Sequence, residues 1–375
     1  MKTLILGGYG NFGARIARAL SGDPALAVLV GGRDGARASD FARTLRGHAQ
    51  GVAVDTTSPD LPRLLQRLGV GLVIHTAGPF QQQSYAVAAA AAAAGAHYID
   101  LADGRRFVCD LPAQMDPAFR AAGRSAVTGA STVPALSSAV VDHLCAGWRH
   151  IRSIDICIAP AQTAPRGLAT MEAVLGYCGR PIEVWSGGRW CTQYGWAQPT
   201  RAEFLHLKPR WGALCDIPDL ELFPARYQVS ERVMFRAALE VRAGQHGLAM
   251  LSWLARRRVV RRPQRWAGAF NRAAAWLDRF GSALGGMFVQ VAGTDMHGRD
   301  LRRTWHIAAD HDHGPEIPCM AAILLARAIA KGEPPPIGAR SCTGLLTLAQ
   351  FEPEFRRWGM VTDVVDEASA HASAA

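Results

Sequence analysis

The chain has 375 residues, of which 49% are hydrophobic, so it can bury a large core, and its length predicts two domains. Its formal net charge is +10, but no zinc-finger, RNP or helix-turn-helix pattern accompanies this charge, which argues against a nucleic-acid partner. The eight cysteines form no Cys-x-x-Cys pair, and no apolar run crosses a membrane without interruption, which favours reduced thiols in the cytoplasm.

A glycine-rich turn follows the first predicted strand, residues 2–6, and leads into a helix. Its spacing is G-x-G-x-x-G. In this context the first glycine allows a tight turn, the second lets the backbone approach a pyrophosphate, and the third lets helix and strand pack closely. The helix N-terminus offers free N–H groups to the phosphates. The turn therefore predicts a dinucleotide-binding fold, and the predicted cofactor contacts are Gly8, Tyr9, Gly10, Asn11, Phe12 and Gly13.

The end of the second predicted strand, residues 25–30, indicates which dinucleotide is bound. Sites that prefer NAD usually place an acidic residue here to bind the ribose 2′-hydroxyl. This chain instead has two glycines, which leave space, and then Arg33, whose guanidinium can bind a 2′-phosphate in a bidentate manner. Arg37 could add a second cation. The alternative is that Arg33 is solvated and Asp34 binds the ribose; NADP is predicted, with Gly32, Arg33, Asp34 and Arg37 as contacts.

Two later strand ends complete the predicted cofactor site. A third strand, residues 51–55, ends at Asp55, whose carboxylate either binds the adenine amino group or begins the next helix. A fourth strand, residues 71–76, runs into a glycine–proline turn. Ligands bind outside the carboxyl ends of parallel strands, so this turn is expected to contact the cofactor. The residues predicted to do so are Thr76, Ala77, Gly78 and Pro79.

The order of the predicted elements defines two domains. Strands and helices alternate up to residue 132, which predicts a Rossmann-type α/β domain with a doubly wound parallel sheet. Short strands, including residues 203–207, and a hairpin across residues 294–298 then predict an α+β domain with a mixed or antiparallel sheet. The predicted domains are an NADP-binding domain at 1–132, a substrate and dimerisation domain at 133–316 with inserted amphipathic helices at 246–285, a helical region at 317–360 that packs back on the first domain, and a flexible tail at 361–375.

These motifs together resemble the saccharopine dehydrogenase-like NADP-binding family. The segments concerned are G-G-Y-G-N-F-G at 7–13, G-G-R-D at 31–34, T-A-G-P-F at 76–80, G-A-H-Y-I-D-L-A-D at 95–103 and G-A-S-T-V-P at 129–134. The match is close over residues 1–145 and looser beyond. The resemblance implies NADP-linked oxidoreduction, with a C-terminal domain that carries the substrate. The family includes saccharopine reductases, opine-type and polyamine-forming enzymes and trans-acting enoyl reductases.

Nicotinamide chemistry needs a group that handles one proton, and the candidates lie near the fourth and fifth strands. Asp103, just past the carboxyl end of a fifth predicted strand at residues 97–101, is the first choice, with His97 and Tyr85 as further candidates. A helix over residues 168–177 offers substrate contacts from the second domain, namely Thr170, Glu172 and Tyr177. The run Asp-His-Asp-His at 310–313 supplies at most two converging ligands from one strand, so no metal is predicted.

Residues 248–284 combine tryptophan, phenylalanine and arginine in an unusual way. A helix over residues 263–284 would gather its apolar side chains within one arc, with arginines every seven residues along its edge. Three interpretations remain open: packing within the chain, self-association or substrate gating, and peripheral contact with a membrane.

The sequence therefore predicts a cytoplasmic, homodimeric, NADP-dependent oxidoreductase. Its expected reaction transfers a hydride to or from a C=N, C=O or C=C bond of a small or lipid-linked substrate. The alternative is a catalytically silent NADP-binding protein that acts by associating with a membrane or a partner.

Overall fold

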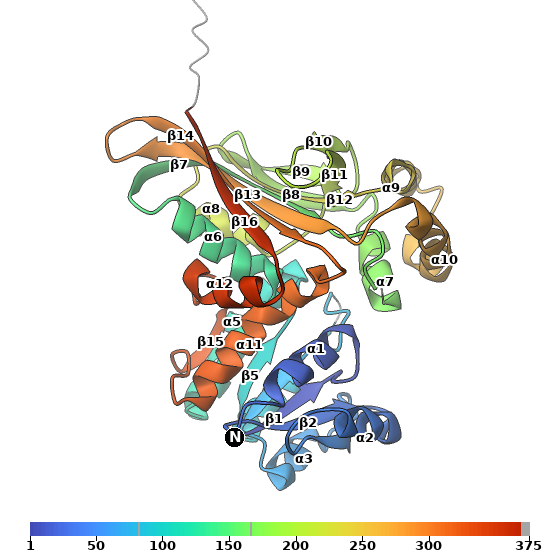
Figure 1. Ribbon diagram of the computed structural model, residues 1–375, viewed down its shortest axis with the longest axis vertical. Helices are drawn as coiled ribbons and strands as arrows, with labels where there is room; N and C mark the ends of the chain where they lie inside the picture. The colour runs from blue at the N-terminus through green and yellow to red at the C-terminus, as the bar shows by residue number, and fades with distance from the viewer. Residues whose placement is uncertain (82, 166, 369–375) are drawn as a thin grey trace, which may run out of the picture. The chain divides into compact units, whose positions relative to one another are not determined.

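The computed structural model describes residues 1–81, 83–165 and 167–368, and these form two compact units (Figure 1). The first unit contains Met1–Leu136 and Pro315–Leu346, and the second contains Ser137–Gly314 and the residues from Thr347 onward. The sequence had assigned residues 317–360 to one block beside the first domain. That assignment is wrong for the residues from Thr347, which belong to the second unit.

The first unit is built on a seven-stranded sheet with the order β15-β6-β5-β4-β1-β2-β3, in which every pairing is parallel. Most residues of its central strands are buried because both faces of the sheet are covered. The strands are β1 Lys2–Leu6, β2 Ala27–Gly32, β3 Gln50–Ala53, β4 Leu72–His75, β5 His97–Asp100, β6 Ser125–Thr128 and β15 Gly338–Ser341. The predicted Rossmann-type sheet is confirmed, and β15 is an additional strand that the sequence did not reveal.

Helices flank this sheet and include one from the C-terminal half of the chain. They are α1 Asn11–Leu20, α2 Gly35–Arg43, α3 Leu61–Leu68, α4 Ala86–Ala93, α5 Arg105–Ala121, a π-helical turn Thr132–Leu136 and α11 Ile317–Ala330. α11 belongs to the first unit, where it contacts α1. Arg327 donates to the carbonyl of Ala19 at 3.3 Å, and Arg15 pairs with Glu316 at 2.6 Å.

The second unit is built on a nine-stranded mixed sheet, in agreement with the prediction. The main path is β10-β11-β12-β7-β13-β14-β16, with β8 paired to β12 and β9 to β8, and only the β12–β7 pairing is parallel. The strands are β7 Trp148–Ala159, β8 Pro181–Ser186, β9 Arg189–Tyr194, β10 Thr200–Ala202, β11 Arg210–Leu214, β12 Arg232–Leu239, β13 Gly285–Asp295, β14 Asp300–Ala309 and β16 Val361–Ala368. The helices are α6 Ser137–Leu144, α7 Leu168–Gly176, α8 Asp219–Arg226, α9 Arg242–Arg256, α10 Ala267–Leu277 and α12 Leu348–Arg357, with 3-10 turns at Pro263–Trp266 and Asp278–Phe280.

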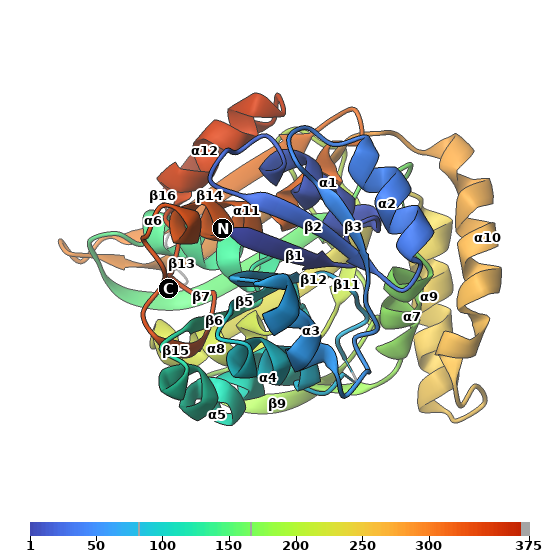
Figure 2. The ribbon, with the colours of Figure 1, turned by 90° about the horizontal axis from the view of Figure 1, so that it is seen from below.

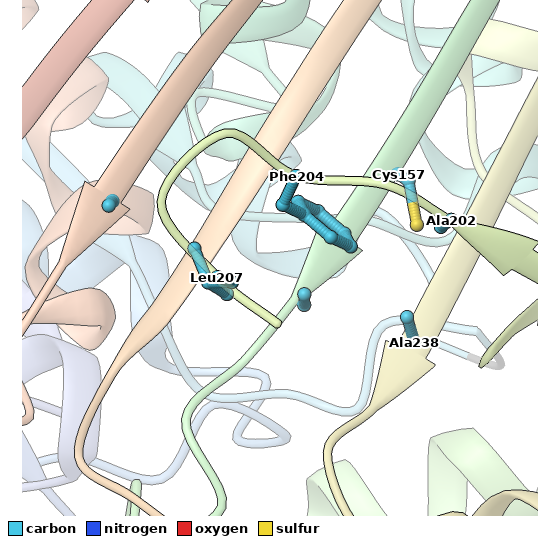
Figure 3. Close-up of a cluster of buried hydrophobic side chains, with 7 residues drawn as sticks. Cys157, Ala202, Phe204, Leu207 and Ala238 are labelled. Carbon is cyan, nitrogen blue, oxygen red and sulfur yellow. The ribbon is translucent and has the colours of Figure 1, made fainter. Parts of the chain in front are cut away.

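Two sequence-based expectations in this unit are wrong. Residues 203–207 are a loop between β10 and β11, and Phe204 and Leu207 project from it onto the sheet, where they pack with Cys157 and Ala238 (Figure 3). Two apolar side chains three positions apart thus anchor a loop here rather than a strand. The expected flexible tail is also wrong for residues 361–368, because they form β16 beside β14.

Among the helices in the described ranges, none is long and apolar enough to cross a membrane.

Candidate functional site

The predicted cofactor contacts gather at one edge of the first unit's sheet. They follow the carboxyl ends of β1, β2, β3 and β4. β1 lies between β4 and β2. The chain therefore continues from β1 to β2 and β3 on one side, and from β4 to β5 and β6 on the other side. In doubly wound sheets such a switch point is where a ligand binds.

In the turn after β1, the backbone around the glycines is packed so closely that a side chain would not fit at these positions. The N–H of Gly8 donates to the carbonyl of Gly31 at 3.0 Å, and the N–H of Gly10 donates to that of Gly7 at 2.8 Å. A Cβ on Gly13 would lie 2.2 Å from the Gly7 oxygen. No side chain caps the first turn of α1, so its N-terminus is suited to a phosphate. The turn thus fits the pyrophosphate of a dinucleotide.

Thr76 supports this turn from the neighbouring strand end. Its hydroxyl donates to the carbonyl of Leu6 at 2.8 Å and lies 3.4 Å from that of Gly7. The hydroxyl hydrogen is therefore used within the protein. Thr76, predicted as a cofactor contact, has a clear role in positioning the glycine turn.

Tyr9 occupies the space that the sequence assigned to the cofactor at Gly32. A Cβ on Gly32 would lie 2.1 Å from Cε1 of Tyr9, so the glycine makes room for this ring. The Tyr9 hydroxyl accepts from the N–H of Asp34 at 3.3 Å, and the Arg37 guanidinium lies over the ring at 5.0 Å. The expectation that Gly32 clears space for the ribose is corrected, because the chain's own ring fills that space.

The two acidic candidates at this edge are engaged in local turns. Asp34 is the N-cap of α2, and its Oδ1 accepts from the N–H of Arg37 at 3.0 Å. Asp55 Oδ1 accepts from the N–H and the hydroxyl of Thr57 at 2.9 and 2.7 Å, and these bonds lower the pKa of Asp55. Arg33 is exposed, and no ion pair to it is found among the residues that the structure describes.

Gln83 is a residue of this site that sequence reasoning missed. Its amide nitrogen donates to the carbonyls of Ala77 and Pro79 at 2.7 and 3.0 Å, and its oxygen lies 3.0 Å from Nε2 of His75. Burial lowers the pKa of His75 to about 4, so that ring is neutral at pH 7. Gln83 therefore holds the turn after β4 in shape. One glutamine among three in sequence gives no signal of this role.

The three proton-donor candidates differ in their surroundings. Asp103 is exposed, follows β5 at the cofactor edge and accepts from Gln81 Nε2 at 3.3 Å. The Tyr85 hydroxyl donates to the carbonyl of Phe107 at 3.2 Å, and burial raises its pKa. His97 is corrected: it begins β5, at the opposite edge of the sheet, and its Nδ1 accepts from the N–H of Ser125 at 3.1 Å.

Asp100 is a buried carboxylate at the end of β5. Its Oδ1 accepts from the N–H groups of Ala102 and Gly129 at 3.0 and 2.8 Å and from the Thr128 hydroxyl at 2.9 Å. Burial nevertheless raises the pKa of Asp100 to about 6. These bonds fix the loop after β6 against β5, beside the cofactor edge.

The remaining candidates lie in the second unit. Glu172 is half-buried on α7, and Tyr177 is the C-cap of that helix. The side chain of Thr170 lies outside the described residues. In the run at 310–313, His311 and Asp312 have positive φ and form a turn, and Nδ1 of His313 lies 3.0 Å from the carbonyl of Trp358.

The comparisons with known proteins agree with this geometry. Residues 3–133 match the family model of the saccharopine dehydrogenase NADP binding domain. A search of curated proteins by sequence gives no match.

Two solved structures share the whole fold. The apo histidine-tagged saccharopine dehydrogenase (L-Glu forming) from Saccharomyces cerevisiae is similar with a TM-score of 0.69 and 12% identity, covering 98% of this chain and 100% of that one. The homospermidine synthase from Legionella pneumophila in complex with NAD has a TM-score of 0.64 and 10% identity, covering 100% of this chain and 93% of that one. Residues 3–133 thus match a saccharopine dehydrogenase NADP-binding domain, which supports an NAD(P)-dependent oxidoreductase, and the chain as a whole shares the fold of these two structures.

Proposed function

We propose that this protein prefers NADP and transfers a hydride to or from a C=N, C=O or C=C bond of a small or lipid-linked substrate. The observation that carries the proposal is the arrangement at the end of β2. There Arg33 and Arg37 lie beside Asp34, whose carboxylate caps α2. Because Asp34 already accepts the N–H of Arg37, it is held as a helix cap. A cofactor with a 2′-phosphate would meet two guanidinium groups at this position.

The reaction further requires a proton to be supplied or removed, because a bound nicotinamide carries only the hydride. Asp103 is proposed for this task. It lies past the carboxyl end of β5 and accepts a long hydrogen bond from Gln81, and burial raises the pKa of its carboxyl group. Tyr85 is the weaker candidate because its hydroxyl proton is donated to a backbone carbonyl.

Cofactor choice is tested by titrating the protein with NADPH and NADH. Arg33→Ala should weaken NADPH binding about tenfold or more, the equivalent of ~1.5 kcal/mol or more for a charged contact, and leave NADH binding nearly unchanged. Arg46→Ala is the matched control, since Arg46 is exposed and lies beyond the other end of α2. An equal loss for both cofactors would show that Arg33 does not bind the 2′-phosphate.

A second function is supported by a different observation. Large apolar side chains on α9 and α10 are exposed, which fits a protein that binds NADP and acts by associating with a membrane or a partner. Oxidation of NADPH in a panel of imines, carbonyls and enoyl compounds separates the two functions. Turnover of any of these supports the enzyme, and NADPH binding without turnover supports the silent alternative. The expected homodimer is also a proposal, and sedimentation velocity tests it.

A further inference from the structure

The apolar arc of α10 faces outward from the second unit. Trp266, Trp276 and Phe280 have exposed fractions of 57%, 56% and 61%, whereas Ala267 is the buried residue of this helix. At about 100° per residue, the exposed positions 266, 269, 273, 276 and 280 fall within about 80° of one another. An amphipathic helix in a monomeric protein normally turns such an arc inward. Packing within the chain therefore accounts for the half-buried part of the arc, Phe270 and Leu277, but not for these exposed side chains.

The neighbouring helix adds to this exposed surface. α9 and α10 lie side by side at one end of the second unit (Figures 1 and 2). On α9, Met250 and Trp253 are 63% and 54% exposed. Arginine side chains lie against these rings: Arg257 over Trp253 at 5.4 Å and Arg279 over Trp276 at 4.2 Å. Tryptophan next to arginine is typical of a helix that lies in a membrane interface.

Charge indicates what covers this surface. Between Arg242 and Phe280 the chain has nine arginines and one acidic residue, Asp278, so this segment holds +8 of the total net charge of +10. A second copy meeting this surface would place like charges against each other, which costs several kcal/mol in an interface. An anionic bilayer provides the opposite charge and an apolar layer beneath it.

A pocket opens within the same region. Its volume is about 320 Å³, within the usual range of ligand pockets of about 300–1,000 Å³. Its lining residues are Cys178, Gly179, Arg180, Ala255, Arg258, Val260, Arg261 and Pro263. For the three arginines, no carboxylate partner is found within the described part of the chain. Three guanidinium groups around one cavity favour an anion, and the planar fork of arginine suits a phosphate.

The pocket walls are held in place before any ligand binds. The buried Ser252 hydroxyl donates to the carbonyl of Gly195 at 2.8 Å, and the N–H of Gly179 donates to the same carbonyl at 3.0 Å. Arg258 has a φ of +60°, a left-handed conformation that glycine usually adopts after a helix. A side chain is disfavoured in this conformation relative to glycine, yet the arginine places a cation at the cavity.

We propose that α9, α10 and the loop between them dock the second unit onto an anionic phospholipid bilayer. Trp266, Trp276 and Phe280 enter the boundary between headgroups and acyl chains. The pocket lined by Arg180, Arg258 and Arg261 receives a headgroup phosphate. The proposal does not depend on the cofactor or on catalysis.

Sedimentation with vesicles tests the docking. The full chain should bind vesicles of phosphatidylcholine with phosphatidylglycerol at low salt, and binding to phosphatidylcholine alone should be far weaker. At about 1 M salt, where the Debye length is about 3 Å, binding to the anionic vesicles should fall steeply. Absence of binding at low salt overturns the proposal.

Two sets of variants with matched controls locate the surface. Each arginine near an anionic membrane contributes about 1 kcal/mol, a factor of about five, so Arg180→Gln, Arg258→Gln and Arg261→Gln together should weaken partitioning about a hundredfold. The control removes three exposed arginines elsewhere: Arg46→Gln, Arg67→Gln and Arg149→Gln. The apolar set is Trp266→Ser, Trp276→Ser and Phe280→Ser, with Leu205→Ser and Met296→Ser as its exposed control.

Loss of vesicle binding in the two test sets but not in their controls supports the proposal. An equal loss of binding in a control set overturns it, because net charge or general hydrophobicity would then explain the binding. Two other results also overturn it: conversion of a dimer to a monomer by the apolar set, which assigns the surface to a second copy, and binding of duplex DNA or RNA that survives the tryptophan changes. Unchanged NADPH affinity in every variant shows that the protein is folded. Failure of NADPH binding in the unaltered protein would instead refute the proposed function.

Discussion

One methyl group added at Gly13 tests the assignment of the glycine turn as the cofactor site. The new Cβ of Gly13→Ala would lie 2.2 Å from the carbonyl oxygen of Gly7 and 2.8 Å from Oγ1 of Thr76, whereas real Cβ contacts essentially never fall below 3.0 Å. The turn must therefore move by roughly 1 Å, and a displacement of this size can cost about a hundredfold in a positioned site. We expect NADPH affinity to fall at least tenfold.

The same clash also costs stability. Overpacking of a tight site destabilises a protein by about 1–3 kcal/mol, which lowers Tm by about 2–12 °C for a domain of this size. Isothermal titration calorimetry and a thermal melt measure the two effects. Gly22→Ala is the control, because a Cβ there would meet nothing within 4 Å. If Gly13→Ala binds NADPH as well as Gly22→Ala does, the turn is not the pyrophosphate site.

Three further predictions follow from buried or positioned polar groups. Gln83→Leu removes two hydrogen bonds to the turn after β4 and should weaken NADPH binding about tenfold, measured by titration. Asp103→Asn should lower kcat by about 10²–10⁴ without changing cofactor affinity, measured once a substrate is found. Burial raises the pKa of Asp219 to about 7, so the folded state holds a proton that the unfolded chain loses above about pH 4. Stability should therefore fall as the pH rises from about 4 to 7, and Asp219→Asn should be more stable than the parent by roughly 1–4 kcal/mol at pH 8 but not at pH 4, measured by urea denaturation.

The first sheet was predictable because its information is local. Each strand is a short apolar run, and each turn carries its own glycines, so six strands could be found in order. β15 escaped because its four residues, two of them half-exposed, pair with β6 across about two hundred residues of chain. Pairing over such a separation leaves no trace in a short window of sequence.

The last strand was missed for a different reason. β16 is an edge strand, and edge strands are commonly charged. Its small and polar composition gave the appearance of a solvated tail, but its acidic residues have partners on neighbouring segments: Asp363 lies 2.5 Å from His206, and Asp366 lies 3.1 Å from Arg303. Composition alone could not show that His206 and Arg303 lie beside the acidic residues of β16.

The end of β2 shows how sequence alone can give a residue the wrong role. Gly32 and Arg33 were taken together as space and charge for a phosphorylated ribose. The glycine instead accommodates Tyr9, a contact made by a residue 23 positions earlier in the printed sequence. The Arg37 guanidinium lies over the Tyr9 ring, and Arg33 is exposed. We propose that a 2′-phosphate would be bound by guanidinium groups held beside this aromatic ring. Enlarging Gly32 should act through displacement of Tyr9 and weaken NADPH and NADH alike, whereas loss of Arg33 should weaken NADPH alone.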